Sequence, residues 1–73
     1  MSLSQMKIKK PTLTIREIEI MKDVSDGLTS GEIAARRNLS VHTIRNHRKN
    51  ILKKMGLNNI VNAVSRGIRD GWL

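Results

Sequence analysis

The residues best suited to chemistry are basic and amide side chains gathered in the segment VHTIRNHRKNILKKM, residues 41–55. Wound as a helix at about 100° per residue, this segment has an apolar stripe centred on Ile44. The opposite side carries Arg45, Asn46 and Lys49. Arginine and lysine donate to O6 and N7 of guanine, and asparagine pairs with N6 and N7 of adenine. The pattern predicts that these three side chains read bases in a DNA major groove, although each alone also fits an ordinary solvent-facing helix residue.

A second set of polar residues is suited to contacts with phosphate groups. Four hydroxyl residues fall at the expected starts of two helices, where free N–H groups and the positive end of the helix dipole favour an anion. Simple helix capping would also explain Thr29 and Ser40. Lys53 continues the basic side of the segment, and Arg48 is expected to lay its stem along the core edge with its guanidinium turned outward. The expected DNA-backbone contacts are Thr29, Ser30, Ser40, Thr43, Arg48 and Lys53.

The charge of the chain is concentrated in the same region. Lys and Arg number 14 against 6 Asp and Glu, a net charge of +8, and no acidic residue lies between Ile33 and Arg69. Such a one-sided distribution is typical of a surface that meets phosphates. A solvated basic face with no partner fits the charge equally well. The alternative function is therefore a basic module that binds protein or RNA without sequence specificity.

The remaining composition excludes several classes of protein. A chain of 73 residues makes one small domain, and it contains no apolar run near the ~20 residues that span a bilayer, so we expect no membrane partner and a cytoplasmic location. Trp72 is the only aromatic residue, which argues against nucleic-acid binders that stack bases on aromatic side chains.

Nothing in the sequence indicates an enzyme. The chain has no cysteine, and therefore no disulfide, thiolate nucleophile or cysteine zinc site. His42 and His47 are five residues apart, about 140° around a helix, so they cannot share a metal ion as an i,i+4 pair does. His47 is expected to pack at the edge of the core. We expect no catalytic residue, no metal and no cofactor.

Four helices are expected to position these side chains. Two T-x-x-E capping boxes, one at Thr14 and one at Thr29, mark helix starts, and Gly56 and Gly71 mark helix ends. The second and third helices are joined by a short turn, the plan of a helix-turn-helix. The expected fold is all-α, a four-helix bundle with a central helix-turn-helix. The predicted helices cover residues 14–25, 30–37, 41–55 and 59–70.

Two parts of the chain differ in pattern. Residues 1–12 are basic and show little periodicity, so they are expected to form a flexible arm, a linker or the remnant of a tag. Residues 13–73 are expected to form the folded domain.

The run LTIREIEIMKDVSDGLTSGEIAARRNLSVHTIRNHRKNILKKMGL resembles the LuxR-type (NarL/FixJ) helix-turn-helix DNA-binding domain of bacterial transcription regulators. The resemblance implies sequence-specific binding of double-stranded DNA for transcription regulation, in the bacterial nucleoid. It places Arg45, Asn46 and Lys49 at base-reading positions and Ser40 and Thr43 at backbone positions. It further implies a homodimer on DNA through the fourth helix and RNA polymerase as a further partner. The chain is then either a stand-alone member or, as we favour by analogy, the output domain of a two-component or ligand-responsive regulator whose regulatory domain is missing from this chain.

Three residues depart from the family pattern. Arg37 stands where a leucine usually closes the second helix, so either its stem replaces the leucine or that end of the core is looser. Ile60 stands where arginine is common, and Trp72 replaces an aliphatic residue and is expected to cover the end of the core. The fourth helix is consequently apolar over a broad side, part of which packs on the core while the rest is free to pair with a second copy. The candidate dimer face is Val61, Val64 and Ile68, although each of these residues also fits simple packing on the core.

Overall fold

The computed structural model describes residues 12–73, which form four α-helices and, within that range, no strand. The all-α prediction is confirmed. The predicted bounds 30–37 and 41–55 match the structure, whereas 14–25 and 59–70 were each too long by their capping residues. Residues 1–11, which hold most of the expected basic arm, lie outside the described residues. The helices are α2 (Ile15–Ser25), α3 (Ser30–Arg37), α4 (Val41–Met55) and α5 (Ile60–Arg69).

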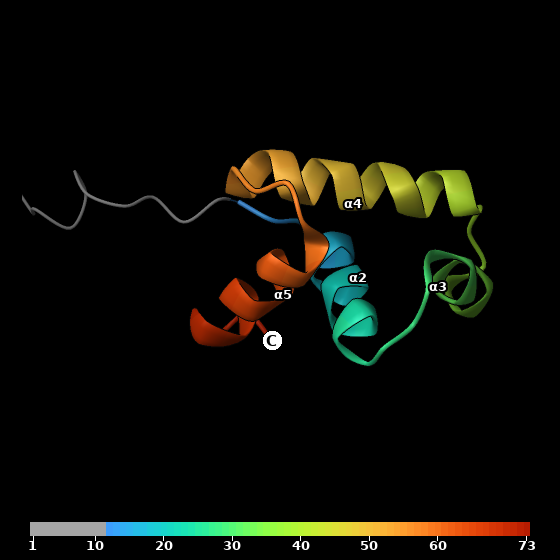
Figure 1. Cartoon of the computed structure of the whole chain (residues 1–73). Coiled ribbons are helices and arrows are strands. Elements are labelled where there is room, and N and C mark those ends of the chain that lie inside the picture. Colours follow the sequence, from blue (N-terminus) through green and yellow to red (C-terminus); the bar gives the residue numbers. More distant parts are fainter. Residues whose placement is uncertain (1–11) are drawn as a thin grey trace, which may run out of the picture.

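The longest helix, α4, lies along one side of the molecule, and the other three helices lie on its inner side (Figure 1). α3 lies beside the N-terminal end of α4, α5 lies toward its C-terminal end, and α2 lies between them. α4 packs against all three of the other helices. Its opposite face is therefore left at the surface of the domain.

The core is formed where the apolar stripes of the four helices meet. In α2, α4 and α5 the apolar residues recur at intervals of three or four, which turns them to one side, whereas the short α3 contributes the adjacent Ile33 and Ala34. Ile44 and Ile51 of α4 are fully buried, as the stripe predicted. The buried hydrophobic residues are Ile20, Met21, Ile33, Ala34, Ile44, Ile51, Met55, Ala63 and Val64.

All four helix starts are capped by side chains. The predicted capping box of α2 is confirmed: the Thr14 N–H donates to Glu17 Oε1 at 2.9 Å, and Thr14 Oγ1 accepts from the Glu17 N–H at 3.0 Å. The box that begins at Thr29 is also present. Ser40 caps α4 and Asn59 caps α5. Caps of this kind are each worth about 1 kcal/mol, and they fix where each helix begins.

All four helices also end in the same way. Two or three residues beyond the end of each helix, a backbone N–H donates to the carbonyl five residues earlier. The residue that donates has a partly buried apolar side chain packed on the core. In the turn between α3 and α4, Asn38 takes the left-handed conformation (φ 57°) that ends α3. Leu39 then donates its N–H to Ala34 and packs on the core, which holds the turn in place. The four bonds are Leu28 to Asp23, Leu39 to Ala34, Leu57 to Leu52 and Trp72 to Gly67.

Two buried carboxylates of α2 join α2 to α3 and α4, and the sequence pattern predicted neither of these contacts. Glu17 is 3% exposed and accepts a hydrogen bond from Lys54 Nζ of α4 at 2.8 Å. Asp23 is 2% exposed and lies against two arginines of α3. Burial raises the pKa of Asp23, but the hydrogen bonds and charge of Arg37, and then of Arg36, outweigh burial and hold that pKa below its ordinary value.

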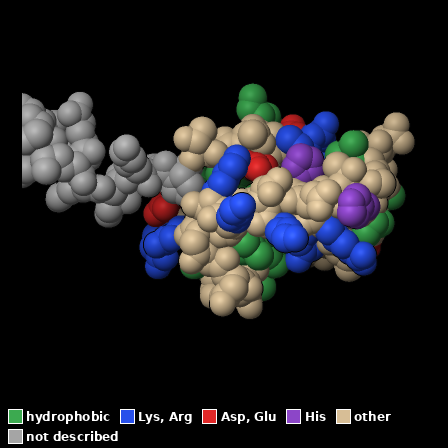
Figure 2. Space-filling view, turned by 90° about the horizontal axis from the view of Figure 1, so that it is seen from above, with side chains coloured by type: hydrophobic (Ala, Val, Ile, Leu, Met, Phe, Trp, Pro, Cys, Tyr) green, Lys and Arg blue, Asp and Glu red, His purple; other side chains and the backbone are tan. Residues whose placement is uncertain are grey.

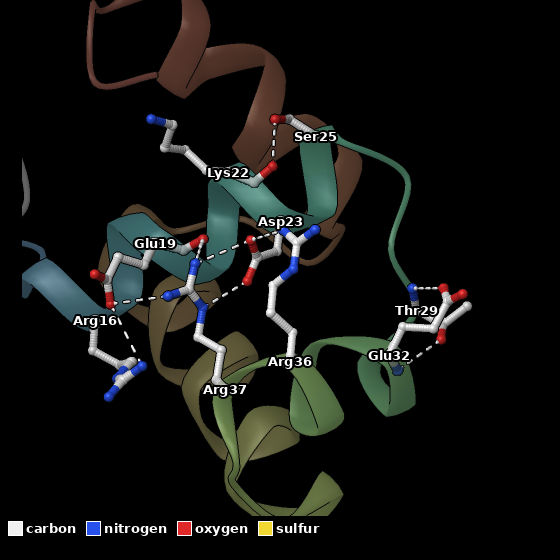
Figure 3. A network of polar contacts seen from close by, with 9 residues as sticks. All are labelled: Arg16, Glu19, Lys22, Asp23, Ser25, Thr29, Glu32, Arg36 and Arg37. Carbon is white, nitrogen blue, oxygen red and sulfur yellow. Dashed lines mark hydrogen bonds and ion pairs between the residues drawn. The ribbon is translucent and has the colours of Figure 1, made fainter.

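The arrangement around Asp23 explains the unusual Arg37 (Figure 3). Arg37 Nε donates to Asp23 Oδ2 at 2.7 Å and Arg37 Nη2 donates to Oδ1 at 3.0 Å, a bidentate pair. Arg36 Nη1 donates to Oδ1 at 3.1 Å, and Glu19 lies 3.5 Å from Arg37 Nη1. Neither of the two sequence interpretations of Arg37 included this ion pair. Here Arg37 is the α3 side of a charge cluster that links α3 to α2.

The other two residues that depart from the family pattern, Trp72 and Ile60, pack on the core. Trp72 is partly buried against the core residues, which confirms the expectation that it covers one end. Ile60 is also partly buried there.

None of the helices within residues 12–73 has the length and apolar character needed to cross a membrane.

Candidate nucleic-acid interface

The outward face of α4 carries the side chains that the sequence assigned to base reading. Arg45, Asn46, Lys49 and Lys53 are all exposed, and we call these four residues the basic face of α4. They are turned outward because the other side of the helix is held in the core by Ile44. Figure 2 views the molecule from the α4 side and shows Lys and Arg side chains spread along it.

The basic face of α4 is not neutralised by the described part of the chain. Every ion pair within residues 12–73 uses Glu17, Glu19 or Asp23 of α2. Arg45, Lys49 and Lys53 form none of these pairs, and residues 1–11 contain no acidic residue. The acidic partners of these ion pairs are thus all on α2, and none of them reaches the basic face of α4. A surface with several uncompensated positive charges concentrates anions near it.

The expected phosphate contacts fall into two groups in the structure. At the start of α3, Arg48 Nη1 of α4 donates to Ser30 Oγ at 2.8 Å, which brings these two candidates together. Thr29 is next to them and is occupied as a cap, since its N–H donates to Glu32 Oε1 at 2.8 Å. The hydrogen bonds from Thr29 hold the pKa of the Glu32 carboxyl below its ordinary value, so this position also carries a negative charge.

The second group lies at the start of α4. Ser40 Oγ accepts from the Thr43 N–H at 3.0 Å and lies 2.8 Å from Thr43 Oγ1. The capping role considered for Ser40 is therefore present. Capping leaves the first N–H groups of α4 directed outward from the helix end, which suits an anion. Lys53 belongs to neither group and lies farther along the basic face of α4.

Two ion pairs of α2 hold α3 and α4 in position, although their residues are not part of the proposed DNA-binding surface. Asp23 and Arg37 tie the end of α3 to α2, just before the turn that leads into α4. Glu17 and Lys54 tie the C-terminal half of α4 to the start of α2. The sequence held one signal for Asp23: at three residues beyond Ile20 it falls on the apolar stripe of its helix, where a charge needs a buried partner.

The two histidines are separate, His42 being exposed and His47 half-buried at the edge of the core. Within residues 12–73 no three His, Asp or Glu side chains come together in a way that would hold a metal ion.

The candidate dimer face on α5 is narrower than predicted. Val61 is 64% exposed and Ile68 is 59% exposed, as a pairing surface requires. Val64 is only 9% exposed and is one of the buried hydrophobic residues, so it offers little surface to a second copy. The reason is the close approach of α5 to α2 at Gly67, which turns Val64 inward with it.

Comparison with known proteins identifies the family to which this four-helix domain belongs. A family model described as "Bacterial regulatory proteins, luxR family" matches residues 11–66. The chain belongs to that family. The luxR-family match covers α2, α3, α4 and most of α5, and the family is one of regulatory proteins, not an enzyme class.

Individual luxR-family relatives agree with this assignment. The chain is 35% identical to the transcriptional regulatory protein DegU of Brevibacillus brevis, covering 94% of this chain and 30% of that protein. It is 37% identical to the transcriptional regulatory protein DesR of Bacillus subtilis, covering 82% and 30%. Its fold matches the response regulator ChrA of a heme-sensing two-component system with a TM-score of 0.81 and 25% identity, covering 97% and 35%. The chain thus spans about a third of the length of these proteins.

Proposed function

We propose that this domain binds double-stranded DNA in a sequence-specific manner and regulates transcription, with α4 in the major groove. The observation that carries the proposal is the basic face of α4, which is exposed, has no acidic partner within residues 12–73 and bears side chains that pair with base edges. Membership of a family of bacterial regulatory proteins supports the same function.

The dimensions of α4 suit a major groove. Its 15 residues extend about 22 Å, and a groove about 12 Å wide admits one helix along part of that length. Arg45 and Lys49 are one turn apart, a rise of about 6 Å, which lets them reach neighbouring base pairs. Asn46 lies beside them. Lys53 lies a further turn along, where it would meet the phosphates that flank the groove.

The backbone contacts would hold α4 in that position. Arg48 and Ser30 are already hydrogen bonded, so one phosphate could accept from the remaining donors of the guanidinium. Ser40 and Thr43 would offer hydroxyl and backbone donors at the start of α4. Thr29 is the weakest member of the set, because the adjacent Glu32 carboxylate opposes an anion there.

Pairing through α5 is the second part of the proposal. Val61 and Ile68 would meet the same residues of a second copy about a two-fold axis, giving half-sites about one helical turn apart. We expect Ile68→Ser to reduce complexes with two chains per duplex while leaving complexes with one chain unchanged. Sedimentation of the chain on duplexes with one or two half-sites measures this, and an unchanged two-chain complex would contradict pairing through α5.

The wider setting of the domain follows by analogy with its relatives. The relatives are about three times longer, and those named as response regulators suggest that a regulatory domain controls this one. We propose that the domain is the output part of such a regulator, acts at the bacterial nucleoid, and contacts RNA polymerase when bound to DNA.

The second candidate function is non-specific binding to any polyanion or to an acidic protein, which the net charge of +8 favours. Competition separates the two. The chain is bound to a pool of random duplexes and challenged with heparin or a structured RNA at rising salt. Specific binding predicts that a subset of duplexes resists the competitors, with a log–log salt slope of about −0.9 for each phosphate contact. Equal displacement of all duplexes by heparin and RNA would support the non-specific module instead.

A further inference from the structure

A groove lies between α5 and the turn that precedes it, on a part of the surface that the proposed DNA contacts do not use. It has a volume of about 320 Å³. Leu57 of the turn forms an apolar wall, and the α5 side is polar. The lining residues are Leu57, Asn62, Ser65, Arg66 and Arg69.

The groove is positively charged without a counter-charge. Arg66 and Arg69 are exposed, and neither forms an ion pair within residues 12–73. α5 contains no acidic residue, and Asp70, which follows as its C-cap, does not line the groove. Two arginines three residues apart on a helix have their Cβ atoms about 5–6 Å apart. Two neighbouring acidic residues of one peptide segment can place their carboxylates at a similar spacing.

The position of α5 argues against DNA as the occupant. α5 lies on the inner side of α4, away from the face that would meet the major groove (Figure 1). A duplex bound along that face would leave the groove open. An apolar wall such as Leu57 also suits an aliphatic side chain better than a sugar–phosphate chain.

We propose that this groove binds an acidic segment of a partner protein. Two carboxylates of the segment pair with Arg66 and Arg69, and an aliphatic side chain beside them packs on Leu57. Asn62 and Ser65 supply hydrogen bonds to the backbone of the segment. Because the basic face of α4 is separate, one domain holds DNA and this partner at the same time.

A labelled acidic peptide tests the proposal. The probe is a fluorescein-labelled octapeptide with one Leu followed by Glu alternating with Ser, and the control peptide has Gln in place of each Glu. Binding is measured by anisotropy, and the contacted residues are located from amide shifts of the isotope-labelled chain. The double variant R66A/R69A is compared with R45A/K49A, which removes the same charge from the basic face of α4. Circular dichroism checks that both variants are folded.

The expected result is shift changes at the groove and a loss of about tenfold in peptide affinity for R66A/R69A, the effect of losing two exposed ion pairs. R45A/K49A should change peptide affinity much less, and the Gln peptide should not bind. Equal losses in both variants, or shifts along α4, would overturn the proposal in favour of non-specific attraction.

Two other occupants have their own signatures. If R66A/R69A weakens duplex binding as much as R45A/K49A does, the groove contacts DNA. If R66A/R69A abolishes the two-chain complex on DNA, the groove belongs to a second copy of the chain. Either result would overturn the proposal. Since duplex binding by the unaltered chain is measured separately, failure of the groove proposal and failure of the DNA-binding proposal are distinguishable.

Discussion

Replacing Asp23 by Asn tests how α3, the first helix of the helix-turn-helix, is held on α2. The carboxylate is 2% exposed and accepts three hydrogen bonds, two from Arg37 and one from Arg36. Asparagine has almost the same volume, so the change removes charge without opening a cavity. It also places an NH₂ group against a guanidinium, where two donors face each other.

The expected cost can be worked from the geometry of the pair. Removing one partner of a buried ion pair costs about 3–5 kcal/mol. The Arg37 side chain keeps 21% of its exposure and still has Glu19 at 3.5 Å, so its charge is not left wholly without a partner. We therefore expect the lower end, about 3 kcal/mol. For a chain of this length the total free energy of unfolding is about 4–11 kcal/mol, so the loss is a large fraction of it.

Urea unfolding followed by circular dichroism measures this loss. With a slope of about 1 kcal/mol per molar urea, the midpoint should fall by about 3 M. Asp26→Asn is the matched control: Asp26 is exposed and forms no ion pair within residues 12–73, so its change should stay within about 0.5 kcal/mol.

A double-mutant cycle with Arg37→Met separates the pair from its surroundings. Arg37→Met should cost less in the Asp23→Asn background than in the unaltered chain, because the charge it leaves behind is already gone. The reasoning about this cluster would be refuted if Asp23→Asn cost no more than Asp26→Asn, or if the two substitutions were simply additive.

Two further predictions concern acid stability and helix packing. The pKa values of Glu17 and Asp23 lie below their ordinary values of 4.5 and 3.8 in the folded chain, so both carboxylates stabilise it above those values. The free energy of unfolding should therefore fall as pH drops below about 4.5, and a flat profile between pH 5 and 2.5 in urea titrations would contradict this. At Gly67 an added Cβ would lie 2.9 Å from Cε of the buried Met21, so Gly67→Ala should lower the thermal midpoint, with a net loss of about 1 kcal/mol. Gly31→Ala, in an open helical position, should instead raise the thermal midpoint, with a gain of about 0.5–1 kcal/mol in the free energy of unfolding. Equal shifts of the midpoint for both alanine variants would refute the close approach of α5 to α2.

Helix positions were predictable because their signals are local. Thr14, Thr29 and Ser40 each cap a helix within three residues along the chain, and Gly56 takes the left-handed conformation that ends α4. The basic face of α4 follows from the period of a single helix in the same way.

Contacts between distant residues were not predictable from these signals. Glu17 and Lys54 are 37 residues apart, and Asp23 and Arg37 are 14 apart, so their pairing depends on how the helices pack. Val64 shows the same limit. The apolar side of α5 is broad, and only the packing against α2 decides which part of it is covered.

The central claim is that α4 reads base sequence, and selection from random duplexes by the unaltered chain and by Lys49→Ala tests it most directly. Lys22→Ala, at an exposed lysine near the end of α2, is the matched control because it removes the same charge away from α4. We predict a defined preferred sequence for the unaltered chain and for Lys22→Ala. Lys49→Ala should lose preference at one position of each half-site, by about 1–3 kcal/mol, and keep the rest. Identical preferences for all three proteins, or none for any of them, would contradict the claim.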